Sequence, residues 1–251
     1  MTIASSNAWV TCPQPNPNAS LRLFCFPYAG GSAFTFRSWA AQLPATIELY
    51  PIELPGRGLR IREKPLPRML SLVQTIAPFL LPYLDKPFAF FGHSMGALVS
   101  FELARLLHKE YKCSPSHLFV SGRRAPQVPD PDPPIHTLPN SEFLQELRRL
   151  NGTPEAVLQN DELMQLLLPT LRADFAVLET YVYTPQPLLD YPITAFGGLQ
   201  DPEVCCEVLE AWRDQTRAAF SLHMFPGDHF FLHTAQSLLL QSLNQTLIQL
   251  Q

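Results

Sequence analysis

The stretch FAFFGHSMGALVSFELAR, residues 88–105, decides the fold of this chain. Its first part is an uninterrupted run of apolar and aromatic residues, which predicts a buried strand, and its second part has the composition and periodicity of a helix. Between them, the five residues GHSMG at 92–96 match Gly-x-Ser-x-Gly, a pattern that puts a serine on a sharp turn from strand to helix. We call residues 92–96 the serine elbow. A strand, a tight turn and a helix in this order predict an α/β protein.

Short apolar runs of the same kind recur along the chain and alternate with longer segments of helical periodicity. The expected strands are 21–27, 47–53, 88–93, 117–121, 192–197 and 220–225. The expected helices outside the middle of the chain are 95–110, 202–219 and 232–250. This alternation is typical of a mostly parallel central sheet flanked by helices.

Residues 125–185 break the alternation, and we call them the helical insertion. They begin with a proline-rich segment and continue with leucine-rich helical stretches at 140–150 and 155–183. We expect a helical lid over the sheet, in which the leucines make a small core of their own and some of them line an acyl-binding cavity. The leucines concerned are Leu144, Leu147, Leu150, Leu158, Leu163, Leu166, Leu167, Leu168, Leu171 and Leu178. The chain is then a flexible lead-in over 1–20 and a single domain over 21–251.

Composition and charge exclude several functional classes. The 251 residues are 46% hydrophobic and 16% charged, enough to bury one sizeable core. A formal net charge of −4 offers no basic field for nucleic acid. Five cysteines without Cys-x-x-Cys spacing argue against a disulfide or zinc framework. Because neither a basic, apolar leader nor a run of about 18 apolar residues occurs, we expect a cytoplasmic protein that does not bind membranes.

A serine is a poor nucleophile unless a histidine takes its proton and a carboxylate orients that histidine. We expect Ser94 to be the nucleophile and His229 the base, because His229 follows a Pro-Gly-Asp turn after the last expected strand. His223 lies within that strand and His233 within the final helix, so both are less suited. His93 is adjacent to the serine, and we interpret it as a packing residue.

The expected carboxylate is Asp201, which follows the strand at 192–197 and a Gly-Gly turn. The alternative is that Asp201 caps the helix expected at 202–219, with Pro202 in its first position. These two roles compete for one side chain, and the position at the carboxyl end of a strand favours the catalytic role. Asp228 and Asp190 are the remaining candidates, and Asp228 is too close to the histidine in sequence to reach its ring easily.

Two backbone amides are expected to bind the oxyanion of the reaction. The loop FPYAGGS at 26–32 follows the first strand, and Met95 begins the helix after the serine. The amides of Ala29 and Met95 are therefore the expected oxyanion donors.

Segment 57–68 is rich in basic side chains, with Glu63 as its one acid. Its cations are Arg57, Arg60, Arg62, Lys64 and Arg68. Either the segment is a docking patch for an acidic partner or it is a solvated loop, and the second interpretation is favoured.

Eight stretches, in order over about residues 20–240, resemble one family: FPYAGGSA, ELPGRGLR, GHSMGAL, FELAR, SGRRAP, LRADF, ITAFGGLQDPEV and GDHFFL. The chain resembles the type II thioesterases that accompany nonribosomal peptide and polyketide synthetases, within the α/β-hydrolase superfamily. The resemblance implies an α/β-hydrolase fold with residues 125–185 as the lid. It also implies Ser94, Asp201 and His229 as the catalytic triad and Ala29 and Met95 as the oxyanion donors.

The activity implied by the resemblance is hydrolysis of aberrant or stalled acyl groups from the phosphopantetheine thiol of carrier-protein domains, through an acyl-serine. The implied partners are acyl-loaded carrier domains, and the resemblance implies no cofactor and no metal. We expect a monomer. A general carboxylesterase or lipase would use the same triad, and a chain-releasing thioesterase would share the mechanism. A non-catalytic binding protein of the same fold is the alternative from another class.

Overall fold

Six parallel strands form the centre of the molecule. The computed structural model describes residues 8–250, and in it the strands lie in the order β2-β1-β3-β4-β5-β6 with every pairing parallel. The strands are β1 (Leu21–Phe26), β2 (Ile47–Pro51), β3 (Phe88–His93), β4 (His117–Ser121), β5 (Ile193–Gly198) and β6 (Phe220–Phe225). All six strands expected from the sequence are therefore confirmed.

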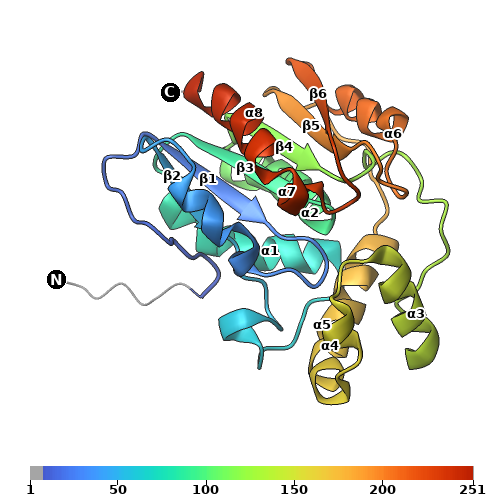
Figure 1. Cartoon of the computed structure of the whole chain (residues 1–251). Coiled ribbons are helices and arrows are strands. Elements are labelled where there is room, and N and C mark those ends of the chain that lie inside the picture. Colours follow the sequence, from blue (N-terminus) through green and yellow to red (C-terminus); the bar gives the residue numbers. More distant parts are fainter. Residues whose placement is uncertain (1–7, 251) are drawn as a thin grey trace.

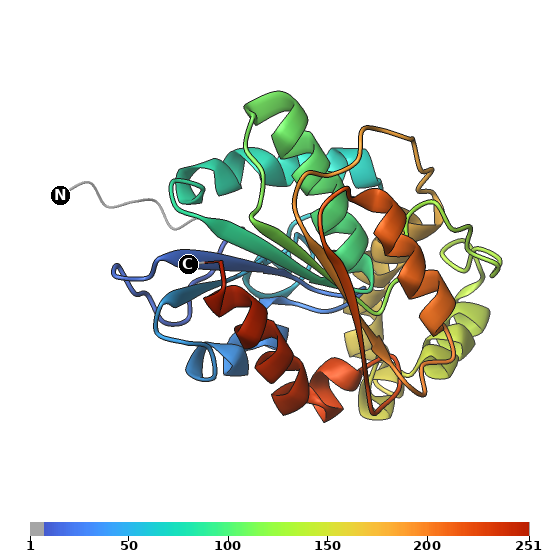
Figure 2. The ribbon, with the colours of Figure 1, turned by 90° about the horizontal axis from the view of Figure 1, so that it is seen from above.

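Helices cover both faces of this sheet (Figures 1 and 2). The helices α1 (Met69–Leu80) and α2 (Met95–Leu106) lie on one face, and α8 (Gln236–Ile248) lies on the other. Successive strand residues point to opposite faces. In β1, Phe24 accordingly packs in the core beneath α1 and α2, whereas Cys25 packs in the core beneath α8.

Some helices differ from the sequence-based expectation. Helix α1 was not expected, because Pro78 interrupts its pattern near the end. The helix expected at 202–219 is reduced to α6 (Cys206–Glu210) and one 3₁₀ segment, Ala211–Gln215. The last helix is divided at Ala235, whose backbone is not helical, into α7 (Phe231–Thr234) and α8.

The helical insertion contains α3 (Asn140–Leu150), α4 (Glu155–Leu158) and α5 (Asp161–Glu179), gathered beyond the carboxyl ends of the strands (Figure 1). It has the small core that the leucines predict, made by Ile135, Phe143, Leu147, Leu158, Met164 and Leu171. Three of the leucines are exceptions, because Leu163 and Leu166 are 41% and 53% exposed and Leu178 packs against the main core.

The two ends of α5 have different surroundings. Its first turns belong to the small core of the helical insertion, through Met164 and Leu171. Farther along, Val177 is fully buried in the same core as α1 and α2. The helical insertion is thus anchored to the main body of the protein through α5.

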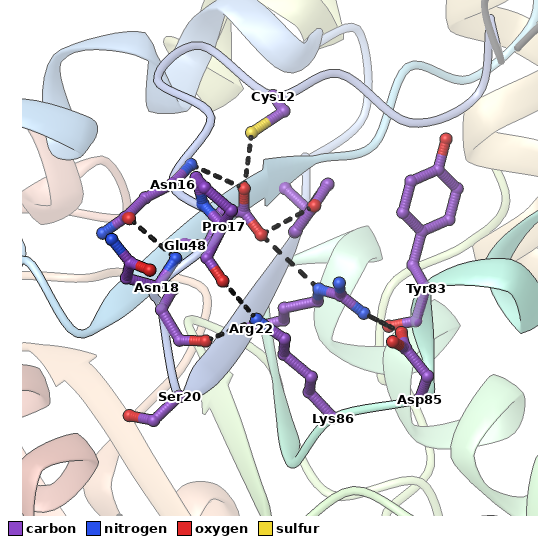
Figure 3. A network of polar contacts seen from close by, with 12 residues as sticks. Cys12, Asn16, Pro17, Asn18, Ser20, Arg22, Glu48, Tyr83, Asp85 and Lys86 are labelled. Carbon is purple, nitrogen blue, oxygen red and sulfur yellow. Dashed lines mark hydrogen bonds and ion pairs between the residues drawn. The ribbon is translucent and has the colours of Figure 1, made fainter. Parts of the chain in front are cut away.

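The amino-terminal segment differs from the flexible lead-in that we expected over 1–20. Residues 1–7 lie outside the described residues, but Trp9 and Val10 are buried, and Val10 pairs with Ile52 in an antiparallel bridge next to β2. Farther along, Glu48 of β2 accepts a hydrogen bond from the Asn16 amide at 2.8 Å (Figure 3). Two isolated apolar residues in a proline-rich stretch have no periodicity, which is why the sequence did not predict this packing.

The topology determines where a ligand site can form. Chain order runs from β1 to β2 on one side of β1 and then returns to β3 on the other side. In open α/β sheets, binding sites lie outside the carboxyl ends of the strands at this kind of reversal. The loop after β1 and the serine elbow after β3 both lie there. No helix within residues 8–250 is long and apolar enough to span a bilayer.

Candidate active site

Ser94 has a strained backbone that its neighbours enforce. It lies at φ 53° and ψ −113°, in the left-handed range that non-glycine residues rarely adopt, and its amide donates to Ser121 O at 2.7 Å. A Cβ on Gly92 would lie 2.1 Å from Gly96 O, and a Cβ on Gly96 would lie 2.0 Å from Phe26 O. Both glycines of the serine elbow are therefore required by contacts between backbones.

Asp201 and His229 are hydrogen-bonded to each other. The Asp201 carboxylate is fully buried, and its Oδ2 lies 2.7 Å from Nδ1 of His229. Its other oxygen, Oδ1, accepts from the amides of Glu203 at 2.8 Å and Val204 at 3.2 Å. No helix begins at Pro202, because α6 starts at Cys206 with Cys205 as its N-cap, so the helix-capping alternative is wrong. Oδ1 instead holds the turn at 203–204, and Oδ2 orients His229.

Ser94 and His229 line the same cavity, together with Ala29. Among residues 8–250, the Ser94 hydroxyl makes no direct hydrogen bond to His229. Catalytic hydrogen bonds are often long in a free enzyme and shorten when the substrate binds. The structure therefore brings Ser94, His229 and Asp201 to one site, but Ser94 and His229 are not hydrogen-bonded to each other in it.

The other candidate histidines have different surroundings. His93 is fully buried, its Nδ1 lies 2.8 Å from Ser121 Oγ, and its ring packs 5.3 Å from that of His229. Burial, together with the nearby His229, lowers the pKa of His93 well below its usual value, so this ring is neutral. His233 faces Tyr28 Oη at 3.2 Å, and His223 packs on Phe196.

The two alternative carboxylates also have other partners. Asp228 accepts from the Phe230 amide at 2.9 Å and so stabilises the turn that carries His229. Asp190 forms an exposed ion pair with Arg217 at 2.8 Å.

In the loop after β1, the amides of Gly30 and Gly31 have acceptors and the amide of Ala29 has none among the described residues. Gly30 N donates to Asp174 Oδ2 at 2.8 Å, and Gly31 N donates to Tyr28 O at 2.9 Å. The Ala29 amide finds no acceptor among the described residues, and Ala29 lines the cavity. Met95 is the first residue of α2, where backbone amides lack partners within the helix and the helix dipole favours negative charge.

Leucines of the helical insertion reach the same cavity. Leu147 and Leu150 of α3 and Leu171 and Leu178 of α5 line it. Charged side chains share the lining, among them Arg149, which pairs with Glu203 at 2.6 Å. The cavity is thus largely apolar where the helical insertion covers it.

The basic segment at 57–68 is not one exposed patch. Arg60 is buried, donates to Glu53 O at 2.9 Å and stacks with its guanidinium 3.6 Å from the Trp9 ring centroid. Arg57 is buried too, in an ion pair with Asp174 at 2.6 Å. Only the later cations, Arg62, Lys64 and Arg68, are exposed. Both interpretations are therefore wrong for Arg57 and Arg60, which are buried and paired and so belong neither to a docking patch nor to a solvated loop.

Sequence reasoning missed the role of Asp174. Its carboxylate bonds both to Arg57 and to the loop after β1, although 144 residues separate it from Gly30. No local pattern reveals such a contact. The available signal was that all three residues lie in stretches shared with one family.

A parallel sheet with a serine on a strained turn, and a histidine and an aspartate from two later loops, defines the α/β-hydrolase class. The sequence model of the thioesterase domain family matches residues 21–247. The chain therefore belongs to the thioesterase domain family and is a hydrolase of thioesters, as the sequence indicated.

Three similar proteins illustrate this membership. The gramicidin S biosynthesis protein GrsT of Aneurinibacillus migulanus is 50% identical over 234 residues, which cover 93% of this chain and 91% of that protein. Linear gramicidin dehydrogenase LgrE of Brevibacillus parabrevis is 48% identical over 249 residues, with 98% and 95% covered. The solved structure of the type II thioesterase BorB, from the borrelidin biosynthetic cluster, has a TM-score of 0.87 and 37% identity, with 96% and 98% covered. The resemblance to type II thioesterases is thus confirmed.

Proposed function

We propose that this chain hydrolyses acyl groups from the phosphopantetheine thiol of carrier-protein domains in a nonribosomal peptide or polyketide synthetase. The observation that carries the proposal is the hydrogen bond of 2.7 Å between Asp201 and His229, because His229 lines a cavity together with a serine on a strained elbow. The similar proteins support the substrate, because their names place them in gramicidin and borrelidin biosynthesis. The name of one relative, LgrE, contains the word dehydrogenase, and we do not carry that activity over to this chain. A serine, an imidazole and a carboxylate are instead the groups of acyl transfer.

In the proposed reaction, Ser94 Oγ attacks the thioester carbonyl while His229 Nε2 takes its proton. Asp201 holds His229 in the tautomer that leaves Nε2 free to accept. The amides of Ala29 and Met95 donate hydrogen bonds to the oxyanion. The C–S bond then breaks, and the thiol leaves with the proton from His229.

The resulting acyl-Ser94 is hydrolysed in a second half-reaction. His229 takes a proton from water, whose oxygen attacks the ester carbonyl, and Ser94 leaves with that proton. A thiol of pKa about 8.5 is a better leaving group than an alcohol, so the acid role of His229 is light in the first half-reaction. Side chains, backbone amides and water suffice for both steps, and we propose no bound cofactor or metal.

The experiment is mass spectrometry of carrier domains loaded with acetyl, propionyl or longer acyl groups. Wild-type protein should remove the acyl mass, and Ser94→Ala should fold but lose activity by a factor of about 10³–10⁶. A fluorophosphonate should label the wild type at Ser94.

Two results would contradict the proposal. Turnover of small aryl esters without turnover of any carrier thioester would indicate a general esterase. Absence of both turnover and Ser94 labelling would indicate a binding protein of the same fold.

A further inference from the structure

A buried ion pair joins three segments that are distant in sequence. Arg57 lies in the loop after β2, Asp174 lies on α5 of the helical insertion, and Gly30 and Gly31 lie in the loop after β1. Arg57 Nη2 donates to Asp174 Oδ1 at 2.6 Å, and Nη1 donates to Asp174 Oδ2 at 2.8 Å and to Gly31 O at 3.0 Å. Asp174 Oδ2 also accepts from Gly30 N at 2.8 Å.

The pair is almost completely removed from water. Arg57 is 4% exposed and Asp174 is 3% exposed. Burying two charges costs free energy that their mutual attraction often fails to recover, so a buried pair is weak evidence for a role in stability. The contacts of this pair with the Gly30–Gly31 backbone suggest a different role.

Those contacts hold a defined turn. Gly31 N donates to Tyr28 O at 2.9 Å, and Gly30 has a φ of +77°, as in the third residue of a type II turn. Ala29 is the second residue of this turn. The Gly30 amide, which belongs to the peptide between Ala29 and Gly30, is held by Asp174, so rotation of that peptide would break a charge-assisted hydrogen bond.

Helix α5 makes two further contacts, one with this turn and one with the loop that carries Arg57. A Cβ on Gly30 would lie 2.7 Å from Leu171 Cδ2, so the helix and the loop are in close contact. Thr170, four residues before Asp174 and therefore on the same face of α5, donates to Gly56 O at 2.7 Å. One face of α5 thus holds both the loop after β1 and the loop that carries Arg57.

We propose that Arg57 and Asp174 are positioning residues that fix the Ala29 amide for the oxyanion. The inference rests on the proposed function, in which that amide is one of two oxyanion donors. Arg57 has a second task, because an unpaired carboxylate bonded to Gly30, the residue after Ala29, would oppose the charge of an oxyanion bound by the Ala29 amide. The guanidinium cancels that charge while the carboxylate keeps its hold on Gly30.

The test compares wild type with Asp174→Asn and Arg57→Lys. Asp174→Asn removes the charge and leaves one acceptor, whereas Arg57→Lys keeps the charge and loses the two-pronged contact. The matched control is Glu102→Gln, which removes the carboxylate paired with buried Arg105 at 2.6 Å, away from the loop after β1. Three quantities are measured: kcat and KM on a carrier thioester and on an aryl ester, the affinity for a boronic acid that forms a tetrahedral adduct with serine, and the melting temperature.

For both variants we expect kcat to fall about 10- to 100-fold on both substrates, less than the 10²–10³ typical of removing an oxyanion donor. KM should stay within about twofold, because substrate binding precedes oxyanion formation. Affinity for the boronic acid should fall by the same factor as kcat. Glu102→Gln should keep the wild-type kcat.

Other outcomes would overturn the inference. If Asp174→Asn and Arg57→Lys fold and keep the wild-type kcat, the inference is wrong. It is also wrong if kcat falls while the affinity for the boronic acid stays unchanged. Loss in KM alone, or an equal loss in Glu102→Gln, would also contradict it. Wild-type protein that hydrolyses neither substrate would instead contradict the proposed function. If Asp174→Asn does not fold, Arg57→Lys alone decides by the same readouts.

Discussion

The serine elbow and the helical insertion meet at one cavity but are specified in different ways. In the elbow, each glycine faces backbone atoms at 2.0–2.1 Å from where a Cβ would lie, so hardly any other sequence can form it. In the helical insertion, leucines on three helices make a small core through side chains, which tolerate exchange among similar residues. Backbone contacts fix the position of the nucleophile, and side-chain contacts shape the space for the acyl group.

This comparison predicts that the machinery around Ser94 is the most sensitive part of the molecule. In Asp201→Asn, the amide oxygen should remain with the Glu203 and Val204 amides, so that the NH₂ group faces His229 Nδ1. Nδ1 of His229 must then accept a hydrogen bond from this NH₂ group, so the single proton of the neutral ring lies on Nε2. In that tautomer, Nε2 cannot take the proton of the Ser94 hydroxyl. We expect kcat to fall by about 10⁴ with little change in melting temperature.

The control for this prediction is Asp228→Asn, at the carboxylate that bonds only to the Phe230 amide among described residues. It should keep most of the wild-type kcat. Equal losses in the two variants would contradict the tautomer argument.

The second prediction concerns the two kinds of glycine. Gly96→Ala places a methyl group 2.0 Å from Phe26 O and should lower the free energy of unfolding by more than about 4 kcal/mol. Gly152→Ala, in the helical insertion, meets the end of the Phe230 ring at 2.6 Å, and that ring can rotate away. We expect a loss of about 1–3 kcal/mol there, measured by urea unfolding. A loss in Gly152→Ala as large as in Gly96→Ala would erase the distinction between the two regions.

The third prediction concerns the loss of stability of the folded protein at acidic pH. His117 of β4 is buried against Phe119, and burial lowers its pKa from 6.5 to about 4. The unfolded chain therefore binds a proton between these pH values that the folded chain does not, so stability falls as the pH falls through this window. The contribution of His117 to the loss from pH 7 to pH 5 is on the order of 2 kcal/mol.

His117→Gln should reduce the pH dependence of the free energy of unfolding by that amount, measured by urea titration at both pH values. The buried His93 lowers stability in acid in the same direction, so a residual slope should remain. A variant whose slope equals that of the wild type would contradict the assignment to His117.

The smallest effect is expected in the helical insertion, where changes should alter selectivity more than rate. Leu150→Phe adds volume to the cavity wall and should lower kcat/KM for long acyl groups relative to acetyl by about tenfold. Leu163→Phe, at an exposed position outside the cavity lining, should leave the ratio unchanged. Competition between acyl carriers of two chain lengths measures the ratio directly. An identical ratio in wild type and Leu150→Phe would argue that the acyl group lies elsewhere.

Features set by local pattern were predictable from the sequence. All six strands, the serine elbow, the α3 helix and the pairing of Asp201 with His229 follow from apolar runs and from residues at strand ends. What could not be predicted depends on contacts between distant segments. The Arg57–Asp174 pair, the burial of Arg60 on Trp9 and the packing of residues 9–20 leave no local signature. The division of the last helix falls at Ala235, in the gap between Leu232 and Leu238, where the leucine pattern alone does not show that the backbone leaves the helical conformation.

The antiparallel bridge between Val10 and Ile52 has a consequence for shortened versions of the chain. Because β2 is at one edge of the sheet, its outer backbone groups would be exposed without the segment beside it. Thr11 N donates to Pro51 O at 3.1 Å, and Glu53 N donates to Trp9 O at 2.9 Å, so the segment pairs the backbone at the carboxyl end of β2. An uncovered edge strand is a template on which a second copy can add a strand. A chain that began at Leu21 would keep every residue of the proposed triad and yet should be prone to aggregation.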